Sequence, residues 1–541
     1  MFIVLCFFLF NALSVQGQDW TYDEPEHYKY GMNILNGDST RFDDSKMPVS
    51  VWNALPARIA DVLPDGPMKT DLKQLSTARL MTTLFSIVVA LMVFHWAREL
   101  YGWIPAFFSL ALYVLDPNII AHSQLVTTDI YVTGMVLFSS YWLWRFANDH
   151  NWQNGLWLLL MLGFAQLTKY TAVSLYGLFA IALLVHGWPS LKKTFETGIW
   201  QGVRGVAWQC ARYALVGVAV SMIIINVGFL FNRTFTSLSE YSFRSDLFRS
   251  IQSKISFVVP VPYPYLEGLD WVIQRERTNT GFGRVYLLGE TRFAAGFPGY
   301  YVIASVLKVP IATQIILLSA FAVYLTDRQR WGRFLRNEWF LLWPVLFYVI
   351  YFNFFYRAQM GIRFYLVIFP LLYVFAGGLF VHWRDFGRRQ KLAVLALGIY
   401  LMASVISYYP HYLSYFNEIV WDRKTAYQYL ADSNLDWGQD GLILKQYLVE
   451  HPTVRQAPPK PELLAETTTY FLEINRFLGI TTEPGTFEWL RENFEPVGMI
   501  ASSYLLFEIT PDQMQVLCER TTYCKQDYDQ YIGKDDGNEI W

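Results

Sequence analysis

The chain has 541 residues, of which 53% are hydrophobic, 18% aromatic and only 16% charged. Soluble domains carry about 25% charged residues, so this composition excludes an ordinary soluble protein and indicates a polytopic membrane protein. The net charge of −2 and the absence of a basic low-complexity tract give no reason to expect a nucleic-acid partner.

The first apolar segment covers residues 1–15 and carries no charge. As a helix it would be about 22 Å long, shorter than the roughly 30 Å hydrocarbon core of a bilayer. A cleaved signal peptide is the alternative, but the positively charged start of such peptides is missing. We therefore expect a retained first helix.

A polar loop then spans residues 16–78 and opens with the acidic motif Tyr22-Asp23-Glu24-Pro25-Glu26-His27. Proline suits the first position of a helix, and an acidic residue before it can cap the helix and favour its positive end. The helix should end at Asn36-Gly37-Asp38. A second apolar piece, residues 49–63, is interrupted by Pro56, so the loop should hold short interfacial helices. On these residues alone, the acidic pair Asp23-Glu24 fits a plain helix cap as well as a functional site.

Ten more apolar runs follow and bring the number of expected transmembrane helices to about eleven. They cover residues 80–97, 100–115, 130–144, 156–168, 170–191, 213–231, 309–326, 339–356, 364–383 and 392–409.

The basic residues set the expected orientation, because cytoplasmic loops are enriched in Lys and Arg. A cytoplasmic N-terminus places every dense basic cluster inside, including those around residues 192–212, 328–336 and 384–391. The long loop 232–298 and everything after residue 409 then lie outside.

The outer tail divides at a proline-rich break, residues 452–461, into a juxtamembrane segment (410–461) and a small α/β domain (462–541). In that domain we expect strands within residues 499–509 and a short helix at 487–493. Cys518 and Cys524 can form a disulfide if this domain faces an oxidising compartment.

Polar residues in the short outer loops are the remaining site candidates: Asp129, Lys169, Glu290, Arg357 and Arg363. Lys169, Arg357 and Arg363 oppose the positive-inside bias, although a lone basic residue at a helix end often only contacts lipid headgroups. Asp432, Asp436 and Asp440 have the spacing of one helix face, and either structural capping or acceptor binding would explain them.

Six ordered stretches, spread from residue 22 to about residue 440, carry a resemblance to a known family. They are YDEPEHYKYGMNILNGD, LDPNIIAHSQLVTTDIYVTG, LLGETRFAAGFPGYY, GIRFYLVIFPLLYVFAG, YYPHYLSYFNE and DSNLDWGQD. The chain resembles bacterial membrane glycosyltransferases of the GT-C superfamily, in the protein-mannosyltransferase-like and aminoarabinose-transferase-like branch. The resemblance implies a bundle of eleven to thirteen helices, interfacial helices in the first outer loop, and a site at the outer face of a bacterial inner membrane.

The resemblance also implies an inverting transfer from a polyprenyl-phosphate-linked sugar to a lipid, glycan or protein acceptor. Asp23 is then the expected base, Glu24 positions acceptor or sugar, and Arg363 with Lys169 binds the departing phosphate. The substrate-binding candidates also include His27, Asp129, Arg357 and Glu290. No cofactor or metal is required, although a divalent cation between Asp23 and Asp129 is compatible with the pattern. A transporter or flippase of lipid-linked glycans is the alternative, and it would need polar groups or broken helices near mid-membrane.

Overall fold

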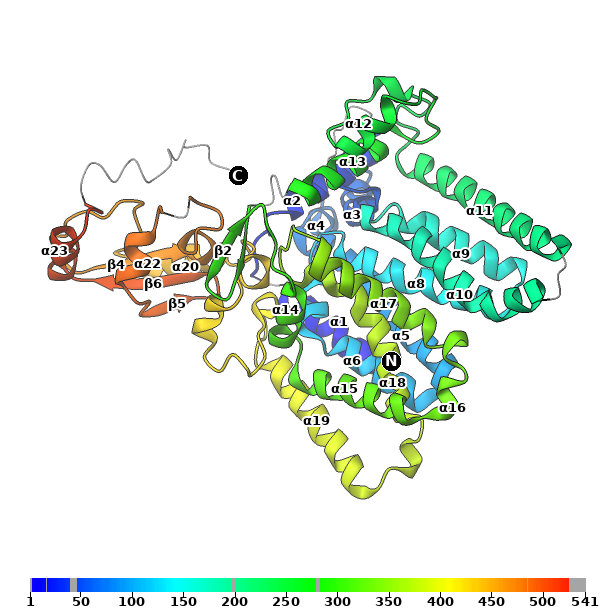
Figure 1. The fold of residues 1–541 in the computed structure, drawn as a ribbon. Helices are drawn as coiled ribbons and strands as arrows, with labels where there is room; N and C mark the ends of the chain where they lie inside the picture. The colour runs from blue at the N-terminus through cyan, green and yellow to red at the C-terminus, as the bar shows by residue number, and fades with distance from the viewer. Residues whose placement is uncertain are drawn as a thin grey trace.

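The computed structural model shows a bundle of helices joined to a smaller body built on a four-stranded sheet (Figure 1). It describes residues 2–15, 17–38, 46–196, 200–278, 283–483 and 485–524. Parts of the expected first loop (16 and 39–45), the long loop (279–282) and the tail domain (484 and 525–541) lie outside the described residues, as does residue 1. The expected fold class is confirmed: a helical polytopic membrane protein with a small C-terminal α/β domain.

The helices up to the tail are α1 (Phe2–Ser14), α2 (Glu24–Leu35), α3 (Val51–Ala60), α4 (Pro67–Leu72), α5 (Leu75–Tyr101), α6 (Trp103–Val114), α7 (Pro117–His122), α8 (Asp129–Asn148), α9 (Trp152–Ala165), α10 (Ser174–Glu196), α11 (Trp200–Gly228), α12 (Asp246–Gln252), α13 (Tyr263–Thr278), α14 (Tyr300–Lys308), α15 (Ile311–Thr326), α16 (Arg328–Trp331), α17 (Trp339–Ile350), α18 (Phe369–Gly377) and α19 (Arg388–Ile406). The tail contains α20 (Gly441–Glu450), α21 (Ile474–Phe477), α22 (Glu488–Asn493) and α23 (Pro511–Arg520). The strands are β1 (Arg284–Leu287), β2 (Glu290–Phe293), β3 (Arg455–Gln456), β4 (Thr468–Glu473), β5 (Gly498–Ile500) and β6 (Tyr504–Ile509).

All eleven apolar runs fall on helices, but they differ in length. Four helical segments among the described residues are long and apolar enough to cross a membrane: Leu75–Tyr101, Tyr170–Pro189, Ile362–Phe380 and Arg388–Ile406. A fifth span results if α14 and α15, which are bent by 116° at their junction, are counted together. In the described part of the chain, four more apolar helical segments are shorter: Val4–Ser14, Trp103–Val114, Leu215–Gly228 and Trp339–Phe355. The number of about eleven spans thus combines full-length helices with shorter or more polar ones.

Three contacts join segments that the alternation of basic loops places at the same end of the bundle. At the end expected to be cytoplasmic, the Trp144 indole donates to the Arg336 carbonyl at 2.8 Å, and Arg145 pairs with Glu99 at 3.0 Å. At the other end the first loop touches the tail, because the Asp19 N–H donates to the Gln439 carbonyl at 2.9 Å.

Helix α2 begins and ends where the sequence predicts, with Gly37 just past its end at φ +71°. Helix α3 differs from the expectation, since it continues through Pro56 instead of breaking there. Its Asn53 donates to the Ala78 carbonyl at 2.8 Å and to Thr82 at 2.7 Å. These buried bonds to α5 hold α3 in place and outweigh the one backbone donor that proline removes.

The tail domain has the strand order β3-β4-β6-β5, parallel between β3 and β4 and antiparallel elsewhere. Strands β5 and β6 and helix α22 confirm the expected strands and short helix, and the Cys518–Cys524 disulfide is present. The sheet begins earlier than the boundary expected at residue 462, because β3 pairs with Tyr470 and Phe471 of β4. A hairpin of the long loop, β1 with β2, lies between the bundle and this domain (Figure 1).

A buried ion pair fixes the start of α2 on the bundle. Both carboxylate oxygens of Glu24 accept from Arg79 of α5, at 2.9 Å from Nε and 2.5 Å from Nη2, and the two side chains are 0% and 1% exposed. Glu24 also accepts from the N–H groups of Thr21 and Val126, both at 2.8 Å. Every oxygen of this carboxylate therefore has two donors, which is what a buried charge requires.

We predict that Arg79→Met will destabilise the protein by about 3–5 kcal/mol, because it leaves the Glu24 charge buried without its partner. The control is Arg292→Met, which breaks the exposed Arg292–Glu290 pair and should change stability by about 0–1 kcal/mol. Chemical unfolding of the purified variants in detergent measures both, and equal effects would contradict the prediction.

Candidate active site

Asp23 occupies the N-cap position of α2, yet its side chain does not cap the helix. Its Oδ2 instead accepts from Nη1 of Arg363 at 2.7 Å, across a sequence distance of 340 residues. The carboxylate is 36% exposed and the guanidinium 6%. Of the two interpretations of the acidic pair, the plain cap therefore fails for Asp23, and its neighbour Glu24 takes over the structural role.

A second ion pair lies beside the first. Lys169, in the loop between α9 and α10, donates to Oδ1 of Asp129 at 2.7 Å, at the start of α8. Its ammonium also lies 4.0 Å from the centre of the ring of Phe364, the residue that follows Arg363 in the chain. Two predicted cations and two predicted carboxylates thus meet at one end of the bundle, and we call these four residues the ionic cluster.

His27 lies against this cluster. It is 7% exposed, and its Nδ1 is 3.5 Å from the Ser50 hydroxyl. Burial, helped by the nearby Lys46 charge, lowers the pKa of His27 to about 3, while Asp23 and Asp129 act in the opposite direction. His27 is therefore a neutral imidazole at physiological pH and serves as a hydrogen-bonding group instead of a charge.

The ionic cluster keeps Asp23 ionised. Burial raises the pKa of its carboxyl. The Arg363 guanidinium, together with Lys46 and His27, lowers this pKa by more than burial raises it, so the pKa ends well below its usual range. For Lys169, burial lowers the pKa and Asp129 only partly compensates. Asp23 paired with Arg363 is thus a weak base until something competes for the guanidinium.

Three of the expected site residues do not face the cluster. Glu24 has no exposed surface and is saturated by Arg79 and two backbone donors. Arg357 donates to the Arg277 carbonyl at 2.9 Å in an exposed position. Glu290 lies on the hairpin, 59% exposed, and pairs with Arg292.

Sequence reasoning missed four residues that the fold brings to the cluster: Lys46, His122, Glu276 and Trp437. His122 and Trp437 lie in the stretches that carry the family resemblance, but nothing local marks them as neighbours of Arg363. Burial lowers the pKa of His122 to about 3. Burial also raises the pKa of Glu276 on α13 to about 7, although its Tyr351 hydrogen bond and the Lys169 charge act the other way.

The acidic residues Asp432, Asp436 and Asp440 of the tail have different surroundings. Asp440 accepts from the Ser503 hydroxyl at 2.7 Å, and Asp436 accepts from the Gly438 N–H at 3.0 Å, so both stabilise the tail fold. Asp432 is different, because its charge faces Arg363 and Asp23. Asp432 also accepts from the Ser433 N–H at 2.5 Å, so structural capping applies to all three residues, and Asp432 alone adds a charge beside Arg363.

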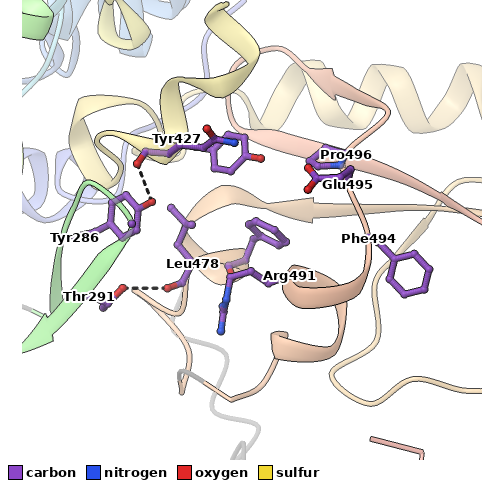
Figure 2. Close-up of a pocket in the computed structure, with 11 residues that line it drawn as sticks. Tyr286, Thr291, Tyr427, Leu478, Arg491, Phe494, Glu495 and Pro496 are labelled. Carbon is purple, nitrogen blue, oxygen red and sulfur yellow. Dashed lines mark hydrogen bonds between the residues drawn. The ribbon is translucent and has the colours of Figure 1, made fainter. Parts of the chain in front are cut away.

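A pocket of about 420 Å³ lies apart from the cluster, between the hairpin, the juxtamembrane segment and the tail domain (Figure 2). The Tyr286 hydroxyl donates to the Gln428 carbonyl at 3.2 Å and the Thr291 hydroxyl to the Leu478 carbonyl at 3.4 Å, so its walls are tied together. None of the residues that line it belongs to the ionic cluster.

A family model matches part of this chain. Residues 72–203, which include Asp129 and Lys169, match the family model described as dolichyl-phosphate-mannose-protein mannosyltransferase. A comparison with curated proteins finds no match.

Two solved structures are similar, both of ArnT from Cupriavidus metallidurans at 14% identity. The one bound to undecaprenyl phosphate has a TM-score of 0.45 and covers 79% of this chain and 68% of its own. The apo structure has a TM-score of 0.29 over 95% and 98%. Both TM-scores are below 0.5, so these likenesses alone do not establish the fold. The family model matches about a quarter of the chain, residues 72–203, and this part contains one of the six stretches that carry the resemblance, LDPNIIAHSQLVTTDIYVTG.

Proposed function

We propose that this protein transfers a sugar from a polyprenyl-phosphate-linked donor to a lipid, glycan or protein acceptor at the outer face of the membrane, with inversion at the anomeric carbon. The observation that carries the proposal is the Asp23–Arg363 pair, which joins a carboxylate of the first loop to a guanidinium at the end of a spanning helix. A polyprenyl donor holds its phosphate at headgroup level, which is where such a pair can reach it.

Arg363 is suited to receive the departing phosphate. Its Nε donates to the Met360 carbonyl at 3.3 Å and its Nη1 to Asp23, while Nη2 makes no hydrogen bond within the residues that the structure describes. Lys169 supplies a second positive charge beside it. The phosphate gains negative charge as the glycosidic bond breaks, and fixed donors in a partly dry site stabilise that charge.

Asp23 is our candidate for the base that accepts the proton of the acceptor hydroxyl or amine. In the resting protein its pKa is held down by Arg363. A donor phosphate that binds Arg363 competes for the guanidinium, weakens the ion pair and so raises the basicity of Asp23. Donor binding by Arg363 and proton acceptance by Asp23 are therefore coupled, because donor binding makes Asp23 a stronger base.

The other cluster residues orient the substrates. Asp129, held by Lys169, can accept hydrogen bonds from sugar hydroxyls, and neutral His27 can donate or accept one. Two protein cations already face the carboxylates that a divalent cation would need, so we propose transfer without a metal. Arg357 and Glu290 lie too far out in the loops to belong to this centre.

The transporter alternative draws support from one feature, the bend of 116° between α14 and α15. This break does not open a polar path at mid-membrane, because Lys308 beside it donates to the carbonyls of Leu413 and Asn434 in the tail. The charges of the ionic cluster lie at the same end of the bundle, which favours chemistry at the surface over passage through the membrane.

We predict that Asp23→Asn will lower transfer by about 10²-fold or more while donor binding survives, because only the proton acceptor is lost. Arg363→Ala should weaken both donor binding and turnover, and Arg363→Lys should recover only part, because an ammonium cannot reproduce the guanidinium fork. Transfer and donor binding are measured in a reconstituted assay.

Arg357→Ala is the control, since Arg357 donates to a backbone carbonyl outside the cluster, and this variant should leave both quantities near wild type. Near-normal transfer by Asp23→Asn would show that the base lies elsewhere, with Asp129 the next candidate.

Glu276 gives a prediction on pH. Its pKa of about 7 means that it is neutral below pH 7 and charged above it, where its carboxylate competes with a phosphate for Lys169. We expect Glu276→Gln to bind the donor progressively better than wild type as the pH rises from 6 to 8. A ratio of the two affinities that stays constant over this range would contradict the assignment.

Orientation is tested with a reporter fused after Trp541. The positive-inside distribution of basic residues predicts that a reporter active only outside the cytoplasm will be active there. Activity of a cytoplasm-specific reporter at this position would place the ionic cluster on the inner face and overturn the proposed donor geometry.

A further inference from the structure

We propose that residues 432–440 of the tail, here called the tail clasp, complete the active site, and that Trp437 is a positioning residue that holds the Arg363 guanidinium in place. The inference rests on the proposed function in that it takes Asp23 and Arg363 as the active pair. It assigns a role in the reaction to a segment that follows the last membrane helix.

On one side the tail clasp is bonded to the loop that carries Asp23. The Tyr22 N–H donates to the Trp437 carbonyl at 3.1 Å, and the Asp19 N–H donates to the Gln439 carbonyl at 2.9 Å. Both donors lie within four residues of Asp23, so the clasp fixes the backbone that presents the carboxylate.

On the other side the tail clasp is bonded to the loop that carries Arg363. The Ile362 N–H donates to Oδ1 of Asn434 at 3.0 Å, and the Ser433 hydroxyl donates to the Met360 carbonyl at 3.0 Å. Gly361 lies between these bonds at φ +72°, and a Cβ there would stand 2.4 Å from Oγ of Ser433. The loop and the clasp are thus in contact so close that only glycine fits at this position.

Between the two loops stands the ring of Trp437. The guanidinium carbon of Arg363 is 4.0 Å from the ring centre, and Trp437 is 3% exposed. A planar cation over an aromatic face in a dry site is held in its plane, and Trp is the strongest partner for such a contact. The ring therefore keeps Nη1 directed at Asp23 and leaves the remaining N–H edge available to a phosphate.

The tail domain in turn holds the clasp. The Asp432 N–H donates to Oδ1 of Asn475 at 2.9 Å, and Nδ2 of Asn475 donates to the Asp436 carbonyl at 3.0 Å. Together with the Asp440–Ser503 bond, these contacts join the ionic cluster to a domain outside the membrane. The clasp therefore connects the loops of the active pair to the tail domain.

The test compares Trp437→Met, which keeps bulk but removes the aromatic face, with Trp437→Phe, which keeps a face. Trp421→Met is the matched control, because Trp421 lies in the same outer segment and is 92% exposed. Hydrogen–deuterium exchange is measured in peptides that cover residues 18–27 and 358–366, and in β4 and β6. The affinity of each variant for undecaprenyl phosphate is measured in detergent.

We expect Trp437→Met to speed exchange in both loop peptides by about 10-fold while β4 and β6 stay unchanged, and to bind the phosphate about 10-fold more weakly. Trp437→Phe should lie close to wild type, and Trp421→Met should be indistinguishable from it. Unchanged exchange in the loop peptides, or faster exchange spread through β4 and β6, would overturn the positioning role.

The two proposals fail separately. If wild-type protein does not bind undecaprenyl phosphate, the proposed donor is wrong, while the exchange data still decide whether Trp437 joins the two loops. If Trp437→Met does not fold, Asn434→Ala replaces it, because it removes the bond to Ile362 and should speed exchange in the 358–366 peptide.

Discussion

The structure depends on the pairing of buried charges at one end of the bundle. A carboxylate or guanidinium removed from water is strongly destabilising unless a partner of opposite charge and good geometry meets it. Asp23 and Glu24 are adjacent in the first loop, and each has a basic partner from a different part of the bundle. Glu24 pairs with Arg79 on α5, and Asp23 pairs with Arg363. The first pair fixes the position of α2, and this makes the second pair available for chemistry.

The different exposures of these two pairs explain why Glu24 is structural and why Asp23 is the residue we propose as the base. Glu24 is completely enclosed and has four donors, so its carboxylate has no capacity left for a substrate. Asp23 is paired with Arg363 and is 36% exposed. A substrate phosphate can compete for Arg363 but cannot reach Arg79. Two neighbouring carboxylates thus acquire different roles from their surroundings alone.

The tail gives the cluster a second support that a bundle of helices alone would lack. Helix ends at a membrane surface leave loops whose backbone is not fixed by helical hydrogen bonds. Here residues 432–440 supply those bonds to both loops, and Lys308 donates to the Asn434 carbonyl of the same segment. An outer domain of this kind contributes to the active site by holding its loops, without contributing to the membrane-spanning core.

The sequence by itself determined the membrane class, the helical identity of the apolar runs, the start and end of α2, the strands of the tail domain and the Cys518–Cys524 disulfide. These follow from hydropathy, helix and strand signals and compartment, all of which act over short stretches. The sequence also marked Lys169 and Arg363, because basic residues in outer loops oppose the usual bias. It marked Asp23 and Asp129 because they lie in stretches that carry the family resemblance.

Only the tertiary structure decided how these residues combine. It paired Asp23 with a residue 340 positions away, turned Glu24 into an anchor, and left Arg357 and Glu290 in exposed loops. It also brought Trp437 over Arg363 and Glu276 towards Lys169. The physical reason is that burial and long-range contact set the charge state and partner of each side chain, and neither is encoded in the spacing of neighbouring residues.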